Sequence, residues 1–484
     1  MQNQFCIFVI LIIEEKKMTK IKFGTDGWRA IIANEFTVEN VARVSIATGE
    51  WVKKNYDNPK IVIGHDCRFA GELFAETATK VFASQGIKVL LAKGFVSTPM
   101  VSLGAVREGA SLGVVLTASH NPPAYNGYKL KGYFGGPLSP EDVQVIEDKI
   151  PDTSNVDLSS SMADLEAAGL LEYIDLETMY VKHVEANFDL EAIKNSGLNF
   201  AYDAMYGAGQ DVMKRILPDC TFLHCEHNPT FYGQAPEPIA KNLVEFSELI
   251  KSKGNIAAGL ATDGDADRIG LYNSKGEFVD SHHILLLLTH YLHKVKGLTG
   301  KVVVAASTTP RVGRLAKMWN LDFDMVKIGF KYIAGQMITE DVLVGGEESG
   351  GIAITGHIPE RDGIWMGLVI FEYMAKSGKT LEELVEEIYA LVGEFKYWRD
   401  DLHLKEEVKQ DVIAKLKSGH FKNFGPYVIE EVQTIDGFKF IFNDDEWLMI
   451  RPSGTEPVLR AYAESKTLDG AKAILKAAKN TLGI

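Results

Sequence analysis

Short apolar runs rich in β-branched residues recur along this chain and alternate with segments of helical spacing. The runs at 60–66 and 113–119 have the composition of buried strands that end in polar residues, and the segment 71–84 between them has helical spacing. Comparable units restart at 198–209 and at 300–307. Because this alternation is typical of α/β layers, we expect several α/β units in succession.

The last part of the chain follows a different pattern. A helix with mixed charges is expected at 405–417, strands follow through 427–450 and 458–463, and a closing helix begins at Thr467. This pattern indicates a smaller α+β domain. A chain of 484 residues exceeds one hydrophobic core, since domains usually hold roughly 50 to 200 residues. We predict four domains, at 18–190, 191–298, 299–396 and 397–484.

The first seventeen residues are interpreted separately. Their apolar stretch at 5–13 is far shorter than a membrane span. The charged residues at 14–17 stand where a secretory signal would have its cleavage site. We interpret 1–17 as an extension foreign to the native protein, with translation starting at Met18. The alternative is a real N-terminal strand that is buried or associated with a membrane.

Charge and cysteine content narrow the partners and the compartment. The net charge of −14 disfavours nucleic acids and anionic membranes as partners. The cysteines are Cys6, Cys67, Cys220 and Cys225. They are too few and too scattered to staple a fold of this size, which favours a reducing, cytoplasmic location. Two cysteines and two histidines at 220–227 fit no common zinc spacing, so we interpret them as structural.

Ser119 ends an apolar strand in the run TASHNP at 117–122. Ligands of α/β proteins bind at the carboxyl ends of strands. The two prolines at 122–123 force an irregular chain there, which would expose the hydroxyl. A serine in this setting is more often part of a turn, and no G-x-S-x-G elbow of a serine hydrolase surrounds it.

Three aspartates alternate with small residues in the run DGDADR at 263–268. The carboxylates of Asp263, Asp265 and Asp267 can converge on one hard cation, and without one they would repel each other. A solvated acidic turn is the alternative. An EF-hand fails, because Arg268 stands at its glycine position and Ser274 at its final glutamate position. We predict a Mg²⁺ site, with Arg268 available to hold phosphate oxygens.

Two further polar loops complete the set. In RPSGTEP at 451–457, an arginine, two hydroxyls and a glycine suit a phosphate that is not transferred. These residues are Arg451, Ser453, Gly454 and Thr455. In GEESGG at 346–351, Glu347 and Ser349 can accept hydrogen bonds from vicinal sugar hydroxyls. Each loop taken alone could equally be a polar turn.

Together, the four loops resemble the α-D-phosphohexomutases, the family of phosphoglucomutase and phosphomannomutase. The resemblance runs from about Phe23 to the C-terminus, with all four signatures in family order. It implies three similar α/β domains with mixed sheets and a smaller α+β domain, arranged around a central cleft. It also implies that Ser119 carries the phosphoryl group and joins the three aspartates as ligand of one Mg²⁺ per active site.

The resemblance assigns further residues. Ser119, His120, Lys129 and Arg29 are the implied catalytic group, with Lys129 assisting proton transfer. Lys331 joins Glu347 and Ser349 in sugar recognition. Arg68 has a family counterpart too, but a structural ion pair explains this residue as well as a functional role does. Many relatives carry a histidine where this chain has Gly351, so the proton-transfer role of that histidine does not carry over.

The expected reaction is reversible exchange between hexose 1-phosphate and hexose 6-phosphate, with glucose favoured and mannose possible. It would run through phosphorylated Ser119 and a hexose 1,6-bisphosphate, which also serves as activator. The alternatives are a phosphoglucosamine mutase, a phosphatase and a non-catalytic sugar-phosphate binding protein. The partners would be small sugar phosphates, on a monomer or homodimer. A hinge at 395–400 would close the last domain.

Overall fold

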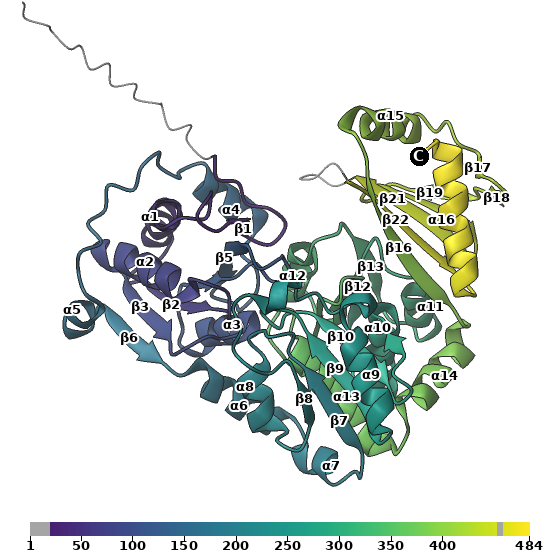
Figure 1. Ribbon diagram of the computed structural model, residues 1–484, viewed down its shortest axis with the longest axis horizontal. Coiled ribbons are helices and arrows are strands. Elements are labelled where there is room, and N and C mark those ends of the chain that lie inside the picture. Colours follow the sequence, from purple (N-terminus) through teal and green to yellow (C-terminus); the bar gives the residue numbers. More distant parts are fainter. Residues whose placement is uncertain (1–19, 453–457) are drawn as a thin grey trace, which may run out of the picture.

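The computed structural model describes residues 20–452 and 458–484. Two sets of predictions lie outside the described residues, those for 1–17 and those for Ser453, Gly454 and Thr455. In the described residues, four sheets of four to six strands follow one another along the chain, with helices packed against them (Figure 1). The predicted fold class, three α/β domains with mixed sheets followed by a smaller α+β domain, is confirmed.

The first sheet has the strand order β1-β5-β4-β2-β3-β6. Its strands are β1 (Trp28–Ile31), β2 (Lys60–His65), β3 (Lys88–Ala92), β4 (Leu112–Leu116), β5 (Tyr125–Gly132) and β6 (Leu171–Ile174). Strands β4, β2, β3 and β6 run parallel, and β5 is antiparallel to β4. The second sheet, β11-β10-β9-β7-β8, contains β7 (Asn199–Asp203), β8 (Thr221–Leu223), β9 (Ile256–Thr262), β10 (Ile269–Asn273) and β11 (Phe278–Val279). The third, β13-β12-β14-β15, contains β12 (Lys301–Ala305), β13 (Phe323–Val326), β14 (Val342–Gly346) and β15 (Ile352–Ile354).

One topology is repeated in these three sheets. The quartets β3-β2-β4-β5, β8-β7-β9-β10 and β13-β12-β14-β15 share the same order, with three parallel strands and an antiparallel fourth. The loop between the third and fourth strand of each quartet therefore occupies the same place. These loops span 117–124, 263–268 and 347–351. Three of the four polar loops singled out in the sequence thus occupy equivalent positions.

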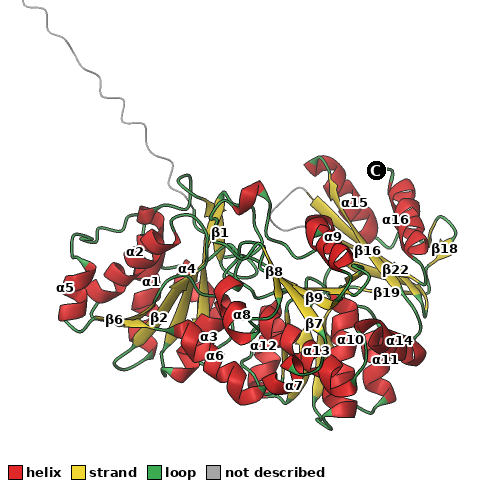
Figure 2. Ribbon diagram, turned by 60° about the horizontal axis from the view of Figure 1, so that its bottom comes forward, coloured by secondary structure: helices red, strands yellow, loops and turns green. Residues whose placement is uncertain are grey.

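Helices cover both faces of the first three sheets (Figure 2). In the first domain, Ile61 and Ile63 of β2 face a core shared with α1 and α2, whereas Val62 faces a core shared with α3 and α6. This alternation is the two-residue period of a strand buried on both faces. The helices of this part are α1 (Val38–Asn55), α2 (Gly71–Ser84), α3 (Thr98–Arg107), α4 (Pro140–Glu147), α5 (Met162–Ala167) and α6 (Leu176–Asn187).

The second and third domains share packing. Helix α13 follows the third sheet in sequence but packs on β9 and β10 of the second. The α-helices here are α7 (Leu190–Lys194), α8 (Gln210–Ile216), α9 (Val244–Lys253), α10 (Ser281–His290), α11 (Arg311–Met318), α12 (Phe330–Thr339), α13 (Gly363–Ser377) and α14 (Leu381–Val392). Short 3-10 turns occur at Phe231–Gly233 and Ala240–Asn242, and a π-helical turn at Tyr291–Val295. No helix in the described part of the chain is long and apolar enough to cross a membrane.

The fourth domain is an antiparallel sheet with two helices. Its sheet, β16-β22-β21-β20-β19, contains β16 (Lys396–His403), β19 (Glu431–Gln433), β20 (Phe438–Asn443), β21 (Glu446–Pro452) and β22 (Val458–Ser465). A hairpin of β17 (Asn423–Phe424) and β18 (Tyr427–Val428) lies beside α16. Helices α15 (Glu406–Lys417) and α16 (Leu468–Leu482) complete it. Helix α16 begins after Thr467, whose hydroxyl accepts the Gly470 amide, and packs on β22 and β16.

Candidate active site

Ser119 lies at the end of β4 in a left-handed backbone conformation, with φ +53°. Residues with a Cβ rarely adopt this conformation, and strained backbone concentrates at functional sites. The side chain is buried, and its Oγ donates a hydrogen bond to Asp263 Oδ2 over 2.7 Å. The Ser119 amide donates to the hydroxyl of Thr117 over 2.9 Å. The first-domain loop and the 263–268 loop therefore meet at the serine hydroxyl.

Arg68 holds the serine loop in this shape. Its guanidinium donates to the carbonyls of Ser119 and Asn121 over 2.5 and 2.6 Å. It also donates to those of Pro122 and Tyr125 over 2.9 and 3.0 Å. The guanidinium is itself fixed by the buried Asp66 at 3.3 Å. The structure therefore shows Arg68 in a structural pairing with Asp66. Through its bonds to the loop carbonyls, this pairing fixes the position of Ser119.

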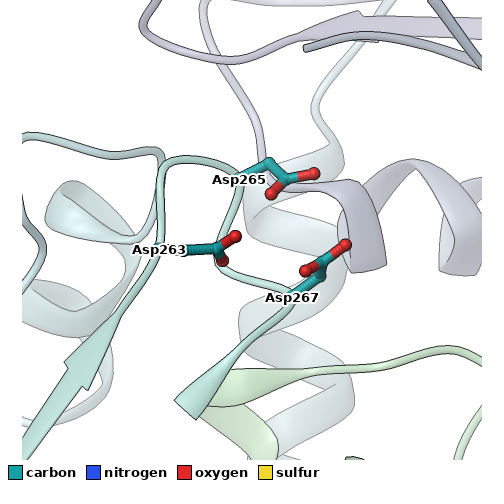
Figure 3. Close-up of side chains that lie close together, drawn as sticks. All are labelled: Asp263, Asp265 and Asp267. Carbon is teal, nitrogen blue, oxygen red and sulfur yellow. The ribbon is translucent and has the colours of Figure 1, made fainter. Parts of the chain in front are cut away.

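The three aspartates of 263–268 point toward one another from a single turn (Figure 3). They are fully buried, and each offers a carboxylate oxygen within 4.8 Å of the others. Within residues 20–452 and 458–484, this is the only group of three or more His, Cys, Asp or Glu side chains so placed. The two histidines and two cysteines at 220–227 are not part of such a group. His224 instead contacts Asp203 at 3.1 Å.

The carboxylate chemistry of this turn fits a cation. Asp265 Oδ1 and Asp267 Oδ1 are buried and have no hydrogen-bond partner among the described residues. Burial raises the pKa of Asp263 well above its usual range, and the charges of Asp267 and Asp265 add to the rise. Buried acceptors without donors are costly, and a hard cation with oxygen ligands would satisfy them.

Lys129 and Arg361 are the cations nearest these carboxylates. Lys129 Nζ lies 2.7 Å from Asp265, 2.9 Å from Asp267 and 2.8 Å from Asp26. Burial opposes its charge, but these three carboxylates prevail and raise the pKa of Lys129. Arg361 Nη2 lies 2.5 Å from Asp26 and 2.7 Å from Asp267. The two cations thus share two of their carboxylate partners.

His120 and Arg29 border the serine. His120 Nδ1 lies 3.3 Å from Ser119 Oγ. Burial, together with Arg268 and other nearby cations, holds the pKa of His120 well below its usual range, so the imidazole is neutral. Arg29 donates to Asn121 Oδ1 over 2.9 Å and lies 3.7 Å from Asp26. His120 therefore contacts the serine hydroxyl itself, and Arg29 contacts the loop that carries it.

The loop 347–351 joins the aspartate loop directly. Arg268 forms an antiparallel bridge with Gly351, and its amide donates to Asp263 Oδ1 over 3.0 Å. Glu347 is buried, which raises its pKa, and it accepts the Gly329 amide over 2.8 Å. Ser349 is partly buried on the same turn.

Lys331 and Arg451 lie farther out. Lys331 lines a cavity of about 150 Å³ together with Asp26 and Gly27. Arg451 donates to Asp436 Oδ1 over 3.1 Å, and the other oxygen of Asp436 accepts the Ile328 amide over 2.9 Å. This contact places Arg451 close to the loop that precedes Gly329, on the side of the fourth domain that faces the third.

The sequence prediction missed three residues of the site: Asp26, Arg361 and Thr98. Asp26 stands directly before the second glycine of GTDGW, and Arg361 stands two residues before the glycine of PERDG; a charged residue close to a glycine in an irregular stretch is only a weak signal. Thr98, whose hydroxyl donates to Asp265 over 2.5 Å, gave no signal at all.

Known proteins share this architecture. Profiles of Phosphoglucomutase/phosphomannomutase alpha/beta/alpha domains I, II and III match residues 20–157, 178–276 and 280–392, and the profile of the C-terminal domain matches 402–480. A phosphoglucomutase/phosphomannomutase of Thermococcus kodakarensis is 29% identical, with 94% of this chain and 96% of the relative aligned. A phosphoglucosamine/phosphogalactosamine mutase of Sulfurisphaera tokodaii is also 29% identical, covering 92% and 95%.

A solved structure gives the same result. A candidate phosphomannomutase from Thermus thermophilus superposes with a TM-score of 0.84 at 32% identity, covering 96% of this chain and all of the other. The chain is thus an enzyme, an intramolecular phosphotransferase. It belongs to the phosphoglucomutase/phosphomannomutase family, the α-D-phosphohexomutases.

Proposed function

We propose that this enzyme interconverts hexose 1-phosphate and hexose 6-phosphate, with glucose favoured and mannose accepted, through phosphorylated Ser119. One observation carries the proposal. The buried Ser119 hydroxyl lies 2.7 Å from Asp263, in a turn whose neighbouring aspartates hold two carboxylate oxygens without partners. A nucleophile beside a cation site is the pairing that phosphoryl transfer needs.

Phosphoryl exchange would proceed in two balanced steps. The free hydroxyl of the hexose monophosphate attacks the phosphorus of phosphorylated Ser119, the bond from phosphorus to Oγ breaks, the proton of the hydroxyl passes to Oγ, and a hexose 1,6-bisphosphate forms. The bisphosphate then turns over, Oγ attacks its other phosphorus, and the isomeric monophosphate leaves. The same bisphosphate would prime the unphosphorylated enzyme. Burial of Ser119 supports this scheme, because water would otherwise hydrolyse the phosphoserine.

Asp263, Asp265, Asp267 and Ser119 would hold one Mg²⁺. When bound, the cation would supply Lewis-acid polarisation of the phosphoryl oxygens. Arg268, whose amide already contacts Asp263, would steady the same oxygens. The unpartnered oxygens of Asp265 and Asp267 support this ligand set.

Proton movement has candidates at stated atoms. His120 Nδ1 lies 3.3 Å from Ser119 Oγ and can accept its proton during the second step. Lys129, kept charged by its carboxylates, is placed to return a proton or to stabilise developing charge. Arg29 would contact the phosphoryl group from the Asn121 side.

Substrate grip would come from the third and fourth domains. Glu347 and Ser349 would accept sugar hydroxyls, with Lys331 beside them. Arg451, with Ser453, Gly454 and Thr455, would hold the phosphate that is not transferred. For the whole protein we propose the domain bounds 18–190, 191–298, 299–396 and 397–484, a cytoplasmic location, and a monomer or homodimer. The cysteine content supports the location.

The test is Mg²⁺-dependent turnover of glucose 1-phosphate, mannose 1-phosphate and glucosamine 1-phosphate, each primed with its bisphosphate. We expect glucose to be the fastest substrate, and Ser119→Ala to abolish turnover of all three. If glucosamine 1-phosphate were turned over fastest, the proposed substrate would change from a glucose phosphate to an amino-sugar phosphate, as in the name of the Sulfurisphaera relative. No turnover of any sugar by the wild type would overturn the proposal.

A further inference from the structure

Arg361 reaches the aspartate turn from the third domain. It lies between β15 and α13, and its side chain is only 3% exposed. Its Nη2 contacts Asp267 Oδ2 at 2.7 Å and Asp26 Oδ2 at 2.5 Å. Asp26 is 335 positions earlier in the chain. One guanidinium therefore ties the first domain, the aspartate turn and the third domain together.

Gly351 makes room for this side chain. A Cβ built at Gly351 would lie 2.5 Å from Arg361 Cδ and 3.2 Å from its Cγ. The neighbouring Gly350 has φ +88°, but Gly351 is not among the residues with positive φ. Glycine is therefore needed at 351 because a Cβ would clash with Arg361, and not because the backbone has a positive φ. Arg361 Cδ cannot move aside cheaply, because both carboxylates anchor the guanidinium beyond it.

The contact also orients Asp267. Its Oδ2 receives both Lys129 and Arg361, at 2.9 and 2.7 Å, whereas its Oδ1 has no partner among the described residues. The two cations hold one oxygen and leave the other for a ligand. Groups that hold the ligands of a metal in place typically contribute roughly 10- to 100-fold to metal affinity.

We propose that Arg361 is a positioning residue of the cation site: seated in the space left by Gly351, it fixes Asp267 through Oδ2 so that Oδ1 is presented to the cation. This inference rests on the proposed Mg²⁺ site. It concerns the side chain of Arg361, which lies outside the four polar loops. It also concerns the space at Gly351, which is part of the 346–351 loop but is neither a ligand nor a nucleophile.

The test uses Gly351→Ala, which displaces Arg361 without changing any charge. Calorimetric titration with Mg²⁺ alone, without sugar, gives the affinity of the full-length protein. We expect Gly351→Ala to bind Mg²⁺ roughly tenfold more weakly than the wild type. In an Arg361→Ala background the same substitution should change the affinity by less than about twofold, because no side chain is left to displace. Excess Mg²⁺ should restore most of the turnover that Gly351→Ala loses.

Two further variants keep the result interpretable. Arg361→Lys retains the charge but cannot span both carboxylates, so we expect an intermediate affinity whether or not Gly351→Ala folds. Gly335→Ala, in α12 with open space around it, is the matched control and should bind Mg²⁺ as the wild type does. Melting temperatures in chelator show whether each variant is folded.

The outcomes separate the two proposals. The role of Arg361 would be overturned, and the cation site left standing, if Gly351→Ala and Arg361→Lys both bound Mg²⁺ with wild-type affinity. The same conclusion would follow if Gly351→Ala lost the same Mg²⁺ affinity in the wild-type and Arg361→Ala backgrounds. A wild-type protein that takes up no Mg²⁺ would overturn the cation site itself.

Discussion

Ser119 Oγ donates a hydrogen bond to Asp263 Oδ2 over 2.7 Å, although 144 positions separate the two residues. Both belong to loops that join the third strand of a repeated quartet to its antiparallel fourth strand. The repeat explains why two loops of unrelated sequence arrive at one place. Each presents the carboxyl end of a parallel strand, where α/β folds bind ligands, and the two domains turn these ends toward each other.

Ser119→Ala should leave the enzyme unable to take up a phosphoryl group. After incubation with hexose 1,6-bisphosphate, intact-mass spectrometry should show one added phosphoryl group on the wild type and none on the variant, with turnover reduced on the order of 10³-fold or more. Ser45→Ala is the matched control, since Ser45 is a buried serine of the same domain, 3.2 Å from the Tyr128 hydroxyl. It should lose about 1 kcal/mol of stability and still be phosphorylated. Phosphorylation of Ser119→Ala would place the nucleophile elsewhere.

Arg68→Lys should slow catalysis by changing the shape of the serine loop. A lysine keeps the charge but cannot reach the four carbonyls that the guanidinium binds. We expect roughly a 100-fold loss of kcat with little change in KM, and a loss of stability of about 3 kcal/mol from the broken buried network. Steady-state kinetics and chemical denaturation measure both. Arg215→Lys, at an exposed pair with Glu177, should alter neither; a kcat for Arg68→Lys equal to the wild type would contradict the role of the loop shape.

Asp265→Asn should weaken Mg²⁺ activation. The substitution removes one of three converging charges and disturbs the contacts of Asp265 with Lys129 and Thr98. We expect the Mg²⁺ concentration for half-maximal activity to rise roughly 10- to 100-fold or more. Chelation should abolish wild-type turnover, and added Mg²⁺ should raise its melting temperature. Asp211→Asn, at an exposed pair with Lys214, is the control. Equal Mg²⁺ dependence in both variants would remove Asp265 from the cation site.

Local patterns predicted the secondary structure well where they were strong. The helical spacing at 71–84 is helix α2 over the same residues, and the closing helix begins after Thr467 because its hydroxyl caps the first turn. The strands expected at 60–66 and 113–119 are β2 and β4, which end one and three residues earlier. Each of these signals lies within a few residues of the element that it predicts.

Long-range partners left no such signal. Arg361 finds Asp26 across 335 positions, and nothing near either residue indicates the other. The hinge expected at 395–400 stays a prediction; most of that stretch lies in a strand, because residues from Lys396 onward form β16, paired along its length with β22. The connection between α14 and β16 is the short segment that includes Gly393, whose φ is +84°. A strand bound by eight register pairs is a poor place for a hinge.

Contacts between the third and fourth domains provide a test that depends on pH. Lys439 of β20 is buried, lies over the Trp447 ring at 4.2 Å, and donates to the carbonyls of Ala306 and Thr308 over 3.0 and 2.8 Å. Burial lowers the pKa of Lys439 from its ordinary value near 10.5 to about 8, and Glu464 offsets only part of this shift. A neutral amine can still donate both hydrogen bonds, so deprotonation relieves burial of charge without breaking the contact.

The free energy of unfolding should therefore rise with pH between about 8 and 10.5. In this window the unfolded chain keeps the proton of Lys439 and the folded chain does not, so stability increases with pH, by about 3 kcal/mol over the whole range. Below pH 8 both states are protonated and the slope disappears. Lys439→Met has no such proton, and chemical denaturation at several pH values should show a smaller rise than in the wild type. Lys472→Met, which removes an exposed lysine over the Trp398 ring in the same domain, should keep the wild-type rise. An identical pH dependence in Lys439→Met and the wild type would contradict the prediction. It would mean that the charge of Lys439 does not destabilise the folded protein, and that the contact between the fourth and third domains does not depend on this proton.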